Sequence, residues 1–181
     1  MASWYYLMSQ LPSITATSER TPLPITEEYF LDLCSRFLDA KSMRILNSLS
    51  LEPPRENKRT GSVFLDAWYD NERTLRYSLA KIRALKMKKD VEIPFLSASP
   101  DIVQAARTAC GMDSPLEAEQ YLNEVRVAMM DRVAPEDHFS TDAVFMYGLK
   151  LKLAKRMKSF TEEAGSASYR TIYDQILGES K

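Results

Sequence analysis

The stretch that decides the fold is Ser62–Lys88, which reads SVFLDAWYDNERTLRYSLAKIRALKMK. Its apolar residues recur at intervals of three, four or seven positions, and neither proline nor glycine interrupts them. These residues are Phe64, Trp68, Leu75, Leu79 and Ile82. The stretch ends with the cations Lys86 and Lys88, and Lys89 comes next. Cations are favoured at the negative, C-terminal end of the helix dipole, so they indicate a helix end there. Pro94 then prevents any continuation, so the stretch predicts one long amphipathic helix.

Two shorter helices are predicted upstream of this stretch. Thr26 is a suitable N-cap, and Glu27 and Glu28 place negative charge in the first turn that follows. A second short helix is expected over about 42–49, before a charged, proline-containing loop. Residues 1–25 are expected to form an aromatic N-terminal anchor and a loop.

Downstream, a helix is predicted over about 100–110, with Gly111 in the position just after its C-terminus. The next helix has the clearest start in the chain. Ser114 is a capping serine, Pro115 suits the first helical position, and Glu117 completes a capping box.

The C-terminal part of the chain contains two further helical patterns. Apolar residues from Val144 to Phe160 predict a long helix that ends near Gly165. A last helix has apolar residues at helical spacing, namely Tyr169, Ile172, Tyr173 and Ile176.

These patterns predict an all-α protein: an irregular multi-helix bundle with two or three long amphipathic helices, in one domain over residues 1–181. The bundle itself is expected over residues 26–181. The 181 residues suffice for a single core, and 5 glycines with prolines between the periodic segments fit helices better than sheets. No repeat of 20 to 50 residues suggests a solenoid.

Composition narrows the classes of function. Lys and Arg number 24 and Asp and Glu 25, so no global charge excess indicates nucleic acid or an anionic membrane as a partner. No stretch resembles a signal peptide or a membrane span. Cys34 and Cys110 lie in apolar helical patterns, which predicts reduced, buried thiols. We therefore expect a cytoplasmic protein, with any attachment to a membrane made through partner subunits.

Residues for catalysis are sparse. The one histidine, His138, lies in an acidic loop, where a local structural role is the better interpretation. Two distant cysteines and one histidine do not supply a zinc site, and the five glycines form no phosphate-binding loop. We expect no catalytic, cofactor-binding or metal-binding residues, no cofactor and no small-molecule substrate.

Two charged stripes remain as candidate sites for docking to a partner. One lies on the long helix of residues 62–88, and the other places five cations within residues 150–158. The candidate docking residues are Arg73, Arg76, Arg83, Lys150, Lys152, Lys155 and Arg156. Internal ion pairs that set helix angles are the alternative role for the same side chains.

Four segments resemble a bacterial family that accompanies V-type ATPase subunits and looks like a reduced form of their C (or d) subunit. The segments are YYLMSQLP over residues 5–12; Trp68-Tyr69, Glu72-Arg73, Leu75-Arg76, Leu79-Ala80 and Arg83-Ala84; Pro115-Leu116-Glu117-Ala118-Glu119; and Tyr147, Lys150-Leu151, Leu153 and Arg156. The family pattern has an aromatic residue where this chain has Asn71.

The resemblance implies a helical adaptor seated between the membrane ring and the central stalk of a rotary ATPase, where it couples ATP hydrolysis or synthesis to ion or proton movement. Its implied partners are the stalk and ring subunits, with no nucleic acid. One alternative is a free-standing adaptor or regulator that binds an acidic protein or nucleic acid through the basic face of residues 150–158. A third hypothesis is an enzyme that uses His138 or a buried carboxylate in a helical active site.

Overall fold

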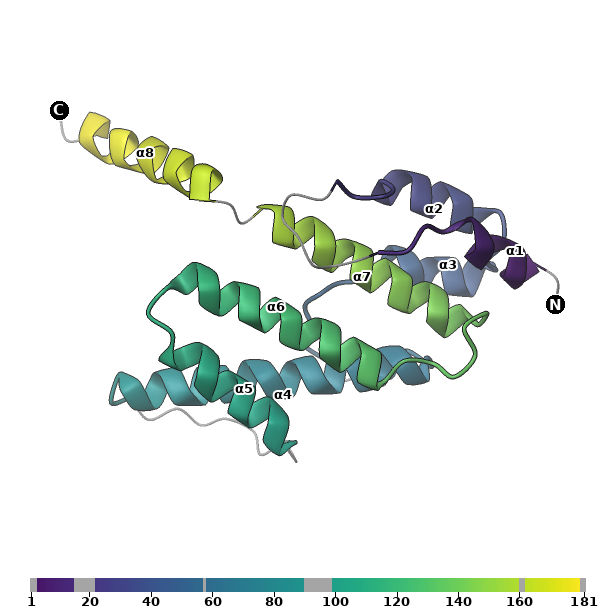
Figure 1. Ribbon diagram of the computed structural model, residues 1–181, viewed down its shortest axis with the longest axis horizontal. Coiled ribbons are helices and arrows are strands. Elements are labelled where there is room, and N and C mark those ends of the chain that lie inside the picture. Colours follow the sequence, from purple (N-terminus) through teal and green to yellow (C-terminus); the bar gives the residue numbers. More distant parts are fainter. Residues whose placement is uncertain (1–2, 15–21, 57, 90–98, 160–161, 180–181) are drawn as a thin grey trace.

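Figure 1 shows the computed structural model of this protein, which describes residues 3–14, 22–56, 58–89, 99–159 and 162–179. All regular secondary structure in these ranges is helical, which confirms the predicted all-α class. The helices are α1 (Ser3–Gln10), α2 (Glu27–Ser35), α3 (Ala40–Asn47), α4 (Val63–Lys86), α5 (Pro100–Gly111), α6 (Pro115–Arg132), α7 (Thr141–Ser159) and α8 (Glu162–Glu179).

Side-chain caps fix the starts of at least five helices, including α3 at Asp39 and α7 at Ser140. Thr26, Ser62 and Ser114 each accept a hydrogen bond from the backbone N–H three residues later, at 3.1 to 3.3 Å. Such a cap satisfies one of the N–H groups that the first turn leaves without a partner. The predicted N-caps Thr26 and Ser114 are thus confirmed, as is the start of the long helix α4.

The C-terminus of α4 is closed by a lysine in the left-handed region. Lys88 has φ 54°, and its N–H donates to the carbonyl of Leu85 at 3.1 Å. The next N–H, of Lys89, donates to the carbonyl of Ala84 at 3.0 Å. These two bonds form the Schellman arrangement that glycine usually provides.

Two predicted helix ends are wrong. Gly111 is the last residue of α5 rather than the residue after it, and Met112 follows in extended conformation. Gly165 lies within α8, since α7 ends at Ser159 and α8 begins at Glu162. A helix tolerates a single glycine at a cost of about 1 kcal/mol, so a glycine alone does not mark a helix end. Phe160 and Pro94 lie outside the described residues.

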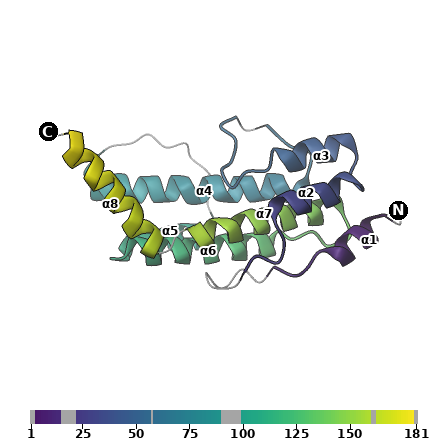
Figure 2. The same ribbon diagram turned by 90° about the horizontal axis from the view of Figure 1, so that it is seen from above.

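Three helices form the centre of the bundle: α4, α6 and α7 contact one another. α5 packs on α4 and α6, whereas α2 and α3 pack on each other and on α7 (Figures 1 and 2). The largest fully buried side chains come from α1, α2, α3, α4, α6 and α7, and include Trp68, Phe30, Phe64 and Phe145. One core therefore joins the two groups of helices through α7.

One carboxylate ties the start of α7 to the start of α4. Asp142 accepts hydrogen bonds from the hydroxyl of Ser62 at 2.6 Å and from the backbone N–H of Phe64 at 3.1 Å. A negative charge in this position also favours the positive end of the α4 dipole. The contact fixes the register of the two longest central helices at one end.

The two cysteines are free thiols. Cys34 is fully buried, and burial raises its pKa to about 12. Cys110 is only partly buried, so the prediction of a buried thiol is confirmed for Cys34 alone. The Cys34 thiol, with so high a pKa, stays protonated and unreactive at neutral pH.

Figure 1 shows α8 projecting from the end of the bundle beyond α7. All of its side chains described between residues 165 and 178 are exposed. Within the described part of the chain, no helix combines the length and the apolar character needed to cross a membrane.

Candidate functional site

The most deeply buried charge is the carboxylate of Glu72, in the middle of α4, which is 0% exposed. It accepts a hydrogen bond from Nε of Arg76, four residues further along the same helix, at 2.8 Å. It also accepts from Nε of Arg126, whose distances to the two carboxylate oxygens are 3.3 and 3.2 Å. Arg126 comes from α6 and is itself 4% exposed, so the pair joins two helices inside the core.

The same network continues to α7. Arg126 donates to Oε1 of Glu119 at 3.3 Å and to Oδ1 of Asn123 at 3.0 Å. Oε1 of Glu119 also accepts from Arg156 on α7. We use the name interhelix ion network for these five linked side chains: Arg76, Glu72, Arg126, Glu119 and Arg156. Within it Glu72 and Arg126 are the buried members, so a shift of α4 against α6 would leave a buried charge without its partner.

The three docking candidates on α4 have different surroundings. Arg73 is mostly buried and donates to Asp70 at 3.2 Å and to the carbonyl of Pro54 at 3.1 Å. Arg76 is a member of the interhelix ion network. Arg83 is exposed and forms no ion pair with any residue that the structure describes. Arg83 is therefore the α4 candidate whose charge is available to a partner.

All four docking candidates on α7 form ion pairs within the chain. Lys150 lies 2.7 Å from Asp131 of α6, and Arg156 pairs with Glu119 as described. Lys152 pairs with Glu27 of α2, whose second oxygen lies 3.0 Å from Lys155. The hydrogen bonds from Lys152 and Lys155 lower the pKa of Glu27. These pairs neutralise much of the positive field that the sequence places on this face.

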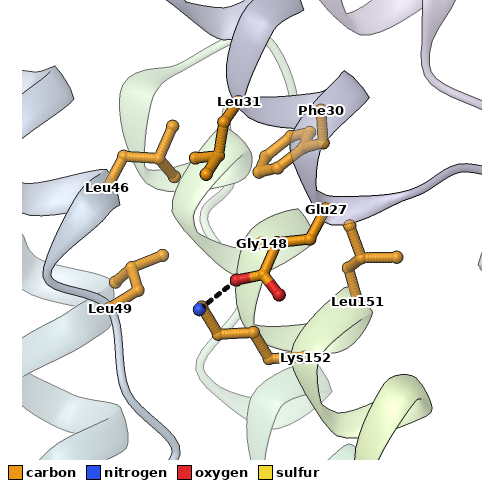
Figure 3. Close-up of a pocket in the computed structure, with 8 residues that line it drawn as sticks. All are labelled: Glu27, Phe30, Leu31, Leu46, Leu49, Gly148, Leu151 and Lys152. Atoms are coloured by element: carbon orange, nitrogen blue, oxygen red, sulfur yellow. Dashed lines mark hydrogen bonds and ion pairs between the residues drawn. The ribbon is translucent and has the colours of Figure 1, made fainter.

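Figure 3 shows the contact between α7 and the helices α2 and α3 beside this pair of charges. Gly148 lies so close that a Cβ on it would be 3.1 Å from a methyl of Leu49 and 3.2 Å from the ring of Phe30. The cavity left there has a volume of only about 10 Å³, which is room for at most one water molecule. Glu27 and Lys152 close one side of it (Figure 3).

A larger pocket of about 340 Å³ lies between α1, the end of α6 and α7. It is lined by Met8, Asp131, Ala134, Pro135, His138, Ala143, Met146, Tyr147 and Lys150. Apart from His138, the polar side chains that line it have partners, because Lys150 pairs with Asp131 and the Tyr147 hydroxyl donates to the carbonyl of Pro12 at 2.8 Å. His138 is exposed and, among the described residues, no hydrogen bond joins it to a hydroxyl or a carboxylate. The hypothesis of an enzyme that uses His138 gains no support from this geometry.

No group of three or more potential metal ligands occurs among the residues that the structure describes.

Two exposed surfaces carry apolar residues that the sequence did not indicate as candidate sites, although the first includes the predicted docking residue Arg83. The first, which we call the α4 tip, consists of Arg83, Leu85, Lys86, Met87 and Lys88, with Leu85 68% and Met87 59% exposed. The second, the α8 stripe, consists of Tyr169, Ile172, Tyr173, Ile176 and Leu177, which are 51% to 68% exposed. Helical periodicity shows that residues share a face, but it does not show whether another helix covers that face.

Comparison of the chain with protein families, with curated proteins and with solved structures finds no match. The resemblance to C-like subunits of V-type ATPases therefore stays a prediction.

Proposed function

We propose that this protein is a non-catalytic helical adaptor of a bacterial V-type rotary ATPase, seated between the central stalk and the membrane ring. The four segments that resemble the C-like family support the identity of the complex. The observation that carries the mechanical role is the interhelix ion network, which braces three long helices against each other.

An adaptor in a rotating assembly has to transmit force without changing shape. The network locks α4 at Glu72, near the middle of the helix, and α4 then continues without interruption to its exposed tip. A partner protein that binds the tip is thereby connected through one stiff helix, α4, to α6 and α7. In this proposal, torque passes through helix packing and ion pairs, and the chain needs no reactive group of its own.

The α4 tip has the composition of a protein-docking surface. Leu85 and Met87 supply exposed apolar area, and Arg83 supplies a cation without an ion pair among the described residues. Methionine, arginine and exposed apolar patches are typical of interfaces, whereas lysine, which the tip also has at Lys86 and Lys88, is depleted there. We propose that the tip contacts an acidic, partly apolar surface of a stalk or ring subunit, which also holds the protein at the membrane.

The test is affinity purification of the tagged full-length chain from a native extract, with the bound proteins identified by mass spectrometry. We expect stalk and ring subunits of the V-type ATPase to be enriched, and Arg83→Glu combined with Leu85→Asp to reduce that enrichment at least tenfold. Lys41→Glu, at an exposed lysine on α3, is the matched control and is expected to bind normally. Absence of every ATPase subunit from the parent purification would refute the proposal.

A further inference from the structure

The α8 stripe covers one side of the last helix. At 100° per residue its five side chains lie within an arc of about 140°, while Ala167 and Thr171 lie on the opposite side. The rings of Tyr169 and Tyr173 stack within the stripe, with centroids 6.1 Å apart. Most of the stability of helices in proteins comes from packing of their apolar face, so a helix with such an exposed stripe gains from a packing partner.

We propose that the partner of the α8 stripe is α8 of a second copy of this chain, packed antiparallel about a twofold axis between Ile172 and Tyr173. In this register Tyr169 lies opposite Ile176 of the second copy, and Ile172 lies opposite Tyr173. These layers each join a tyrosine ring to a branched aliphatic side chain, while Leu177 lies opposite Ser168 at the ends of the interface. A parallel pair would instead place tyrosine on tyrosine and isoleucine on isoleucine, which alternates large and small layers and packs less evenly.

The charges on α8 favour the same direction. Arg170 and Asp174 lie along the same edge of the stripe, and neither forms an ion pair in the described structure. Antiparallel packing brings like edges together, so Arg170 of each copy faces Asp174 of the other and two ion pairs form. Parallel packing would bring this edge against the side that carries Ser168 and Gln175, which have no charge.

The available area matches a weak dimer. Side chains of this size, exposed by 51% to 68%, present roughly 100 Å² each, so the stripe offers about 500 Å² per copy. Two copies would bury about 1,000 Å², which is the lower limit for a specific interface. We therefore expect a closed, twofold-symmetric dimer that dissociates in the micromolar range.

The first test measures the mass of the full chain by sedimentation equilibrium over a range of concentrations. We expect a shift from 20.7 kDa towards twice that mass as the concentration rises to about 100 µM. Ile172→Glu places a charge at the centre of the interface and is expected to weaken association at least tenfold. Ala167→Glu adds the same charge to the opposite side of α8 and is expected to leave association unchanged, which controls for the added charge.

The second test measures the direction of the helices. In a Cys110→Ser background, Tyr169→Cys and Ile176→Cys are mixed and oxidised, and we expect the mixed disulfide to form in preference to either symmetric one. Reversal of the charges in Arg170→Asp should weaken the dimer, and adding Asp174→Arg should restore it. A monomer at all concentrations, a dimer unaffected by Ile172→Glu, or preferential symmetric disulfides would each overturn the proposal.

Discussion

Removal of Arg126 tests whether the interhelix ion network stabilises the fold. Arg126→Met keeps most of the side-chain volume but leaves the buried carboxylate of Glu72 with a single partner, Arg76 at 2.8 Å. Breaking a buried ion pair from one side costs about 3–5 kcal/mol. Because Arg76 remains and is 35% exposed to water, we expect the lower end of this range, about 3 kcal/mol. For a chain of this length that corresponds to a midpoint of thermal unfolding lowered by about 6–12 °C.

The assay is urea unfolding followed by far-ultraviolet circular dichroism. The double variant Glu72→Met with Arg126→Met removes both charges, and we expect it to recover most of the loss, to within about 1 kcal/mol of the parent. Arg36→Met is the control, because the Asp32–Arg36 pair has side chains 56% and 64% exposed and should contribute under about 0.5 kcal/mol. The reasoning is refuted if Arg126→Met costs less than about 1 kcal/mol, or if the double variant costs the sum of the two single variants.

Four further results are expected. Lysine partners hold the pKa of Glu27 below its ordinary 4.5. The stability that this carboxylate contributes is therefore complete above pH 4.5 and is lost as the pH falls through the lowered pKa. Glu27→Gln should make the free energy of unfolding less dependent on acid pH and should change it by under about 1 kcal/mol at pH 7. Gly148→Val should lower the free energy of unfolding by about 1–3 kcal/mol through overpacking. Gly111→Val, whose added Cβ would meet no atom outside its own helix within 4 Å, should change it by under about 1 kcal/mol. Lys88→Gly should raise that free energy by about 1 kcal/mol, because glycine adopts the positive φ without strain; an unchanged value in urea unfolding would contradict this. The indole N–H of Trp68 has no hydrogen-bond partner in the described structure. Trp68→Phe should therefore lower the free energy of unfolding by about 1–2 kcal/mol, and Trp68→Ala by about 3–5 kcal/mol. If both variants lower it equally, the N–H rather than the ring volume is important.

The helices could be predicted from the sequence because their signals are local. Thr26 and Ser114 each lie three residues before the backbone N–H that they cap, and this spacing can be read from the sequence. The pairing of Glu72 with Arg76 follows from the same local geometry. Glycine was the misleading signal, because Gly111 is the last residue of α5 rather than the residue after it, and Gly165 lies within α8 rather than near the end of the preceding helix.

The contacts between helices could not be predicted in the same way. Glu72 and Arg126 are 54 residues apart, and neither residue indicates the other without the fold that brings α4 against α6. A signal was nevertheless present, since Glu72 lies within the apolar stripe of α4 and a charge there needs a buried partner. The role of the α7 cations depended on Glu27, Glu119 and Asp131, which come from other helices. Likewise, the exposure of α8 follows from packing that its own periodicity does not encode.

The adaptor proposal is tested most directly by sedimentation velocity of the fluorescently labelled full chain mixed with purified central stalk and membrane ring of a V-type ATPase. We expect the label to sediment with the ATPase complex, and Arg83→Glu combined with Leu85→Asp to release it. If the parent label sediments at the rate of the free chain at every concentration of the complex, the protein is not an adaptor of that ATPase.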